Sequence, residues 1–167
     1  GDPSADADAE MIALVIYGMK AIGFKNFQVS FTHADIFAGL MEACDFDEDD
    51  RSQIESLIEN HNRFGLQEYL ESRALSSDLL DLFDRMTRIY NEPSDWSELR
   101  QLSSPYSGIS GALDRLGQIY EILRIYGIES YVSFEPGLLA SSRYYTGVIF
   151  AGYTFGSGQA LVRGGRY

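Results

Sequence analysis

A change of hydrophobic period near Gly127 constrains the fold of this chain more than any other feature. Before Gly127, apart from a short strand-like segment at residues 27–31, the apolar residues recur every three or four positions, which is the spacing of amphipathic helices. After Gly127 they alternate with polar residues, as in strands that bury one face. Strands and helices that are segregated along a chain indicate an α+β fold, here with an antiparallel sheet rather than a doubly wound parallel one.

The helical part of the chain is expected to open with an apolar helix that ends at Gly23. Asp6 and Asp8 fall in its first turn, where acidic side chains are favourable because they face the positive end of the helix dipole. Thr32 followed by Asp35 resembles a capping box for the next helix. From residue 47 to about residue 126 nearly the whole pattern is helical. The best helix carries one apolar stripe, formed by Ile109, Ala112, Leu113, Leu116, Ile119, Tyr120 and Leu123.

Short segments with alternating apolar and polar residues are expected to be strands. They lie at residues 27–31, 130–135, 144–155 and 159–163. The Gly-Ser-Gly segment 156–158 suits a tight hairpin turn between the last two strands. The strands in the last part of the chain are therefore expected to form an antiparallel meander.

The charge and composition of the chain exclude several classes of function. The 167 residues carry a formal net charge of −12, whereas a nucleic-acid surface needs clustered lysine and arginine, so we expect no DNA or RNA binding. No apolar run approaches the roughly 20 residues that span a bilayer, so no membrane association is expected. The single cysteine, Cys44, cannot form an internal disulfide, and a reducing, cytoplasmic location is expected.

The acidic run from Asp45 to Asp50 could suggest a calcium loop. An EF-hand loop that began at Asp45 would need glycine at its sixth position and a bidentate acid at its twelfth, but the chain has Asp50 and Ser56 there. His33 and His61 are the only histidines, and no cysteine or acid lies at a metal-ligand spacing from both. We therefore predict no metal site and no cofactor.

Two motifs near the end of the chain are candidates for a small-molecule pocket. Tyr144 and Tyr145 are expected in a strand, where successive side chains point to opposite faces, so one can pack while the other offers its hydroxyl to a pocket. Gly164 and Gly165 allow the backbone to pass close to a ligand or to a neighbouring strand. Core packing explains both motifs as well, but their position on one hairpin favours a shared pocket.

These motifs, taken in order, resemble a known family. The order ADADAE (residues 5–10), YYTG (residues 144–147) and GGRY (residues 164–167) is similar to that of the histidyl-tRNA synthetase-like class II catalytic domain. That family includes the synthetase itself and a catalytically silent relative, the regulatory subunit of ATP phosphoribosyltransferase in histidine biosynthesis. The resemblance covers residues 1–167 as a partial domain and implies that residues 45–107 form a helical insertion.

The resemblance also indicates which branch of the family this chain is closer to. The family's catalytic arginine corresponds to Ala140, the aspartate before its paired tyrosines to Arg143, and a glutamate of the next strand to Ala151. The resemblance gives that arginine the task of stabilising charge as histidine attacks ATP. Loss of such a donor costs about 3–4 kcal/mol of transition-state stabilisation. We therefore expect a non-catalytic subunit with an allosteric, regulatory role, rather than an enzyme.

The residues that line the family's histidine pocket are nevertheless expected to be retained in part. Tyr145 and Tyr167 match tyrosines that line the histidine pocket of the family, and Tyr144 and Gly165 lie beside them in sequence. The resemblance thus implies that the parent protein senses histidine and that its partner is the short-form ATP phosphoribosyltransferase catalytic subunit. Two alternatives stay open: a fragment of a histidine–tRNA ligase that activates histidine with ATP, and a scaffold whose pocket is degenerate.

The two ends of the chain suggest a piece of a longer protein. The chain begins with Gly1 rather than methionine and ends within a glycine-rich turn. The resemblance places the ATP-contacting and dimer-forming motifs of the family outside residues 1–167. We expect homo-oligomers to form through such segments or through an open sheet edge, because an unpaired edge can pair with a second copy.

Overall fold

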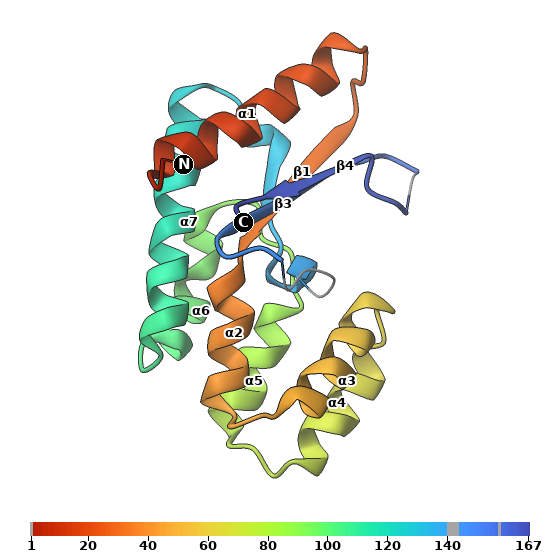
Figure 1. Cartoon of the computed structure of the whole chain (residues 1–167), viewed down its shortest axis with the longest axis vertical. Coiled ribbons are helices and arrows are strands. Elements are labelled where there is room, and N and C mark those ends of the chain that lie inside the picture. The colour runs from red at the N-terminus through yellow and green to blue at the C-terminus, as the bar shows by residue number, and fades with distance from the viewer. Residues whose placement is uncertain (1, 140–143, 157) are drawn as a thin grey trace.

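A mixed sheet organises the chain, of which the computed structural model describes residues 2–139, 144–156 and 158–167 (Figure 1). The described strands are β1 (Phe27–His33), β2 (Val132–Phe134), β3 (Val148–Thr154) and β4 (Val162–Gly165). They lie in the order β2-β1-β3-β4 across the sheet. β3 is antiparallel to both of its neighbours, whereas β1 and β2 are parallel.

The helices lie mainly between β1 and β2 in the sequence, and the α+β class is confirmed. α1 and α7 pack against each other and against β1, and α2 packs on α7 (Figure 1). Among the described residues, no helix combines the length and apolar character needed to cross a membrane. The described helices are α1 (Ala5–Ala21), α2 (Ala34–Ala43), α3 (Glu48–Glu59), α4 (Arg63–Ser72), α5 (Ser77–Met86), α6 (Ser97–Ser103) and α7 (Ser107–Ile125), with short 3₁₀ turns η1 (Pro93–Trp96), η2 (Glu129–Tyr131) and η3 (Pro136–Leu139).

The predicted meander is wrong in its strand order. β1, from the N-terminal part of the chain, lies between β2 and β3, so the strands after Gly127 are not all neighbours in the sheet. Val29 and Phe31 of β1 pair with Val132 and Phe134 of β2 in parallel register. A parallel pair needs a long crossover connection, and the helices from α2 to α7 supply it here.

Two local predictions are also corrected. β3 begins at Val148, so Tyr144 and Tyr145 precede the strand rather than belonging to it. The cap of α2 is His33 and not Thr32: its Nδ1 accepts a hydrogen bond of 3.2 Å from a backbone N–H in the first turn of the helix. Thr32 lies within β1, one residue before this cap, and is fully buried.

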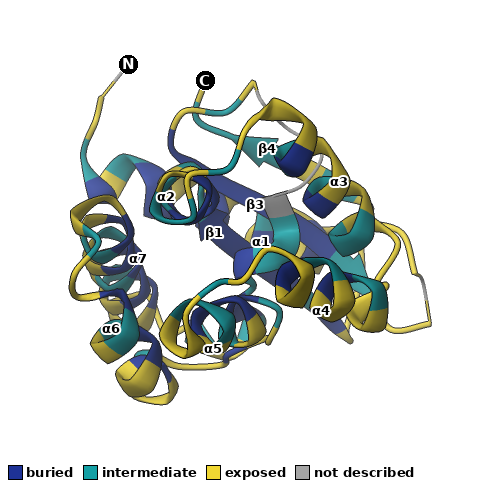
Figure 2. Ribbon diagram, turned by 90° about the horizontal axis from the view of Figure 1, so that it is seen from below, coloured by how far each residue is buried: buried dark blue, intermediate teal, exposed yellow. Residues whose placement is uncertain are grey.

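The core lies between the sheet and its covering helices. Phe31, Phe134 and Phe150 face the same side of three neighbouring strands and are buried. The predicted apolar stripe of α7 is confirmed, because every one of its residues is buried. Trp96 of η1 also packs here, with its ring centroid 4.4 Å from that of Phe134. Figure 2 shows β1 and β3 as the buried centre, with exposed residues on the outer surfaces of the helices.

The acidic run forms a helix cap. The carboxylate of Asp47 accepts hydrogen bonds of 2.9 Å from the backbone N–H groups of Asp49 and Asp50, and the carboxylate of Asp50 accepts one of 3.2 Å from the backbone N–H of Asp47. This is the capping box of α3. Asp50 is buried, accepts a 2.5 Å hydrogen bond from the Tyr69 hydroxyl of α4 and pairs with Arg73. The run therefore joins α3 to α4.

Candidate functional site

The sheet face opposite Phe31 is polar. Ser30 of β1 lies opposite Ser133 of β2 and Ala151 of β3, and Ala151 lies opposite Arg163 of β4. Residues that are opposite one another in a sheet share a face, so these side chains form one strip across all four strands. The hydroxyl oxygens of Ser30 and Ser133 are buried and 3.0 Å apart, which makes them hydrogen-bond partners.

A groove of about 590 Å³ lies over this polar face. The strip supplies the floor of the groove, while residues of the helical part supply its opposite wall. The polar groups that line it are Gln28, Ser30, Ser133, Glu135, Tyr153 and Arg163 from the strands and their ends, and Glu59, His61 and Asn91 from the helical part.

The charges in the groove favour a polar ligand. Burial raises the pKa of Tyr153, and the nearby carboxylate of Glu135 raises it further, whereas the Arg163 guanidinium opposes this rise. The phenol therefore stays protonated at neutral pH and can donate a hydrogen bond. A guanidinium, a carboxylate and a phenol in one groove suit a small molecule that carries both charges.

The structure brings the three predicted tyrosines together. The ring centroids of Tyr144 and Tyr167 are 5.1 Å apart in a stacked arrangement, and those of Tyr144 and Tyr145 are 5.9 Å apart with one edge toward the other ring. Tyr145 is half-buried, whereas 67% of Tyr144 and 79% of Tyr167 are exposed. We call Tyr144, Tyr145 and Tyr167 the tyrosine wall. Its ligand-binding role stays a prediction.

The tyrosine wall contacts the sheet at Gly165, through the ring of Tyr145. Gly165 follows Arg163 by two residues in β4, so both positions face the polar side. A β-carbon at Gly165 would lie 2.8 Å from Cδ1 of Tyr145. Tyr145 therefore lies on the polar face of the sheet, toward the end of β4. The expectation that paired tyrosines alternate across a strand is wrong, because the chain turns before β3 begins.

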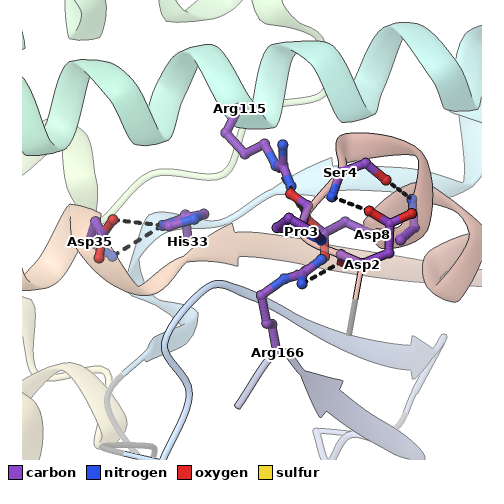
Figure 3. A network of polar contacts seen from close by, with 9 residues as sticks. Asp2, Pro3, Ser4, Asp8, His33, Asp35, Arg115 and Arg166 are labelled. Carbon is purple, nitrogen blue, oxygen red and sulfur yellow. Dashed lines mark hydrogen bonds and ion pairs between the residues drawn. The ribbon is translucent and has the colours of Figure 1, made fainter.

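A buried carboxylate lies behind the wall. Asp8 of α1 accepts hydrogen bonds at Oδ1 from Nε and Nη2 of Arg166, at 3.1 and 2.6 Å. At Oδ2 it accepts bonds from Nε and Nη2 of Arg115 in α7, at 3.2 and 3.1 Å (Figure 3). Arg166 belongs to the GGRY motif, so the motif is joined to two helices from other parts of the chain.

The sequence interpretation missed this role of Asp8. It assigned Asp8 only to the positive end of a helix, although Asp8 precedes the buried Ile12 by four residues and thus lies on the buried stripe of α1. An acidic residue at an apolar position of a helix needs a charged partner. That signal was present in the sequence, but the identity of the partner was not.

His33 lies at the end of β1, and Figure 3 shows it close to Asp35. Burial lowers the pKa of His33, while the negative charge of Asp35 raises it. His33 caps α2 through Nδ1, which accepts a hydrogen bond from the helix backbone. This contact gives the side chain a structural role.

Three positions correspond, by the resemblance, to the catalytic arginine and to two acidic residues of the family. Ala140 and Arg143 lie outside the described residues. Ala151 lies on the polar strip between Ser30 and Arg163 and is 1% exposed. Its methyl group leaves the centre of the strip without a charge.

The chain is similar to histidyl-tRNA synthetases and to regulatory subunits of ATP phosphoribosyltransferase. The family model described as histidyl-tRNA synthetase matches residues 1–167. A protein from Acetivibrio thermocellus named ATP phosphoribosyltransferase regulatory subunit is 33% identical, over all of this chain and 40% of its own length. A protein of the same name from Caldanaerobacter subterraneus subsp. tengcongensis is 28% identical, over all of this chain and 44% of its own. The chain thus spans less than half the length of these relatives.

A solved structure is similar over the same region. It is described as an ATP phosphoribosyltransferase regulatory subunit/histidyl-tRNA synthetase from Bacillus halodurans C. The TM-score is 0.89 at 30% sequence identity, and the match covers 100% of this chain and 44% of that one. The mixed sheet and its helices are therefore shared with a longer protein.

Proposed function

Because this chain belongs to the histidyl-tRNA synthetase family, we propose that it is part of a regulatory subunit of ATP phosphoribosyltransferase, which acts in histidine biosynthesis. The names of its relatives support this proposal. The identity of residue 140 supports a subunit without catalysis of its own, because Ala140 cannot supply the charged donor that the resemblance assigns to this position.

The placement of the tyrosine wall carries the proposal that the subunit binds histidine. Tyr145 lies on the polar sheet face beside Gly165, and Arg163 of the same strand lines the groove. An imidazole ring can pack against aromatic rings, and a carboxylate can pair with a guanidinium. We propose that histidine binds between the wall and the groove, with Tyr144 and Tyr167 completing the wall.

The proposed partner is the short-form ATP phosphoribosyltransferase catalytic subunit. In this role the protein activates the catalytic subunit and transmits inhibition by histidine. Such regulation requires that histidine favour one arrangement of the complex over another, because only a difference in binding free energy can shift an equilibrium. We further propose that residues 45–107 are an insertion in the family domain and that the complex is cytoplasmic.

Self-association is a separate part of the proposal. Within the described residues β4 pairs with β3 alone, so its outer edge is open. An open edge can pair with a second copy or with a further segment of the parent protein. A solution mass that stays monomeric at high concentration would contradict association of this chain by itself.

A histidine–tRNA ligase is the second candidate, because the similar protein from Bacillus halodurans C carries both names. A ligase would catalyse exchange between ATP and pyrophosphate when histidine is present. The regulatory subunit would catalyse no exchange, would co-purify with the catalytic subunit and would make its activity sensitive to histidine.

The deciding experiment uses the full-length protein that contains this chain. We expect isothermal titration with histidine to give a saturable heat, and we expect no histidine-dependent exchange. Exchange at an ordinary enzymatic rate would overturn the regulatory proposal. If histidine gave no heat, the remaining explanation would be an assembly scaffold whose pocket no longer binds histidine.

A further inference from the structure

The carboxylate of Asp8 holds separate parts of the chain together. Asp8 is 7% exposed, and each of its carboxylate oxygens accepts hydrogen bonds from a different arginine. Arg115 belongs to α7, and Arg166 lies 158 residues along the chain from Asp8. The arginines also donate to the backbone carbonyls of Pro3 and Asp2, so the segment before α1 joins the same network (Figure 3). Such charge-assisted, two-point contacts fix geometry as well as distance.

Arg166 carries this constraint to the tyrosine wall. The backbone N–H of Arg166 donates to the carbonyl of Val148 at 2.8 Å, and its carbonyl accepts from the N–H of Thr146 at 2.8 Å. Its side chain covers Gly147, where a β-carbon would lie 2.7 Å from Cδ of Arg166. The segment that carries two of the tyrosines is thus held against Arg166, and Tyr167 is the next residue in the chain.

The wall needs such a support. Tyr144 and Tyr167 are mostly exposed and stack on each other, so the core does not fix their positions. The hydrogen bonds from Arg115 join Asp8 to α7, whose apolar stripe is buried in the core. A rigid support of this kind reduces the ordering that a ligand would otherwise have to impose.

We propose that Asp8 is a positioning residue, which holds the tyrosine wall in its ligand-binding arrangement through Arg166. The proposal rests on the proposed function, because it assumes that the wall binds histidine. Without the carboxylate, the guanidinium groups of Arg115 and Arg166 would face each other as like charges, and Arg166 would move away from its place behind the wall.

The test is made in the full-length protein with Asp8→Asn and with a matched control, Asp114→Asn. Asp114 of α7 also pairs with an arginine, but that arginine is Arg100 and the Asp114 side chain is exposed. Hydrogen exchange is measured without ligand, in peptides that contain Thr146 or Arg166. We expect exchange at least tenfold faster there in Asp8→Asn, with exchange in the apolar stripe of α7 unchanged. The control is expected to match the wild type.

Histidine titration provides the second measurement. We expect Asp8→Asn to raise the dissociation constant for histidine at least tenfold. This weakening should disappear in an Arg166→Gln background, because the connection is already broken there, and should persist in an Arg115→Gln background. A purely structural role would weaken binding in both backgrounds in proportion to lost stability.

The outcomes separate the two proposals. Unchanged exchange at Thr146 and Arg166 in Asp8→Asn would overturn the positioning role. If the wild type binds no histidine, the proposed ligand fails, while the exchange result still decides whether Asp8 holds the wall. Should Asp8→Asn not fold, Arg166→Lys serves in its place, because lysine keeps the charge but cannot make the two-point contact. Unchanged exchange in that variant would likewise overturn the proposal.

Discussion

Tyr145 and Gly165 approach so closely that no side chain larger than hydrogen can occupy position 165. A β-carbon there would lie 2.8 Å from Cδ1 of Tyr145 and 2.7 Å from the carbonyl oxygen of Val148. The aromatic ring could give way, but the backbone carbonyl belongs to β3 and is fixed by the sheet. Glycine is therefore required for close approach, and its replacement should displace the tyrosine wall.

The substitution Gly165→Ala tests this relationship. We expect it to weaken histidine binding by the full-length protein about tenfold or more, equivalent to about 1.4 kcal/mol, because Tyr145 loses its place on the sheet. Titration calorimetry measures the effect. Gly108→Ala is the matched control, since a β-carbon at Gly108 of α7 meets no atom within 4 Å. Equal affinity of Gly165→Ala and wild type would show that Tyr145 takes no part in binding.

The buried pair Ser30 and Ser133 predicts a non-additive effect on stability. Ser133→Ala leaves the hydroxyl of Ser30 buried without its partner, so we expect a loss of about 1–3 kcal/mol in the free energy of unfolding. The double variant Ser30→Ala/Ser133→Ala should lose less than the sum of the two single variants, because no buried hydroxyl is left unpaired. Urea denaturation measures all three, and strict additivity would contradict the prediction.

The contact between Asp50 and Tyr69 predicts a pH-dependent stability. The Tyr69 hydrogen bond is the main cause that holds the pKa of Asp50 below its ordinary value of 3.8. A carboxyl with a lowered folded-state pKa stabilises the fold above the ordinary value, and this contribution is lost as the pH falls through the lowered pKa. Tyr69→Phe should therefore lower the melting temperature at pH 7.

The difference from wild type should shrink as the pH falls below about 3.8. Thermal melting followed by circular dichroism from pH 7 to pH 3 measures this. Tyr17→Phe is the control, because Tyr17 is 49% exposed on α1. A difference for Tyr69→Phe that stays constant over the whole range would argue against a charged Asp50 as the partner.

The only cysteine should react slowly in the folded protein. Burial raises the pKa of Cys44 from 9.0 to about 11. The thiolate is the reactive form, so a rise of two units lowers the reactive fraction at pH 8 by roughly 100-fold. Alkylation by iodoacetamide, followed by mass spectrometry, should be slower by about that factor than in urea-unfolded protein. Equal rates in the two states would mean that Cys44 is not shielded.

Local patterns in the sequence were sufficient for most of the elements and for the class of fold, although not for the start of β3 or the cap of α2. The stripe of α7 was predicted residue by residue, because a helix that covers a core must repeat its apolar residues with the period of the helix. The acidic run, which fails as a calcium loop, forms a helix cap, and this role is local because capping depends on residues within one turn. Of the four residues proposed for histidine binding, Tyr145 and Tyr167 came from the resemblance, and Tyr144 and Gly165 were added because they lie in the same motifs. The structure brings all four together.

Only the tertiary structure decided which segments meet. β1 lies between β2 and β3 because hydrogen bonds join strands that are about a hundred residues apart, and no local pattern encodes such pairing. Asp8 finds Arg115 and Arg166 for the same reason: the sequence can show that a buried charge needs a partner, but not which distant arginine will reach it. The periodic residues determined the elements, and long-range packing determined the site.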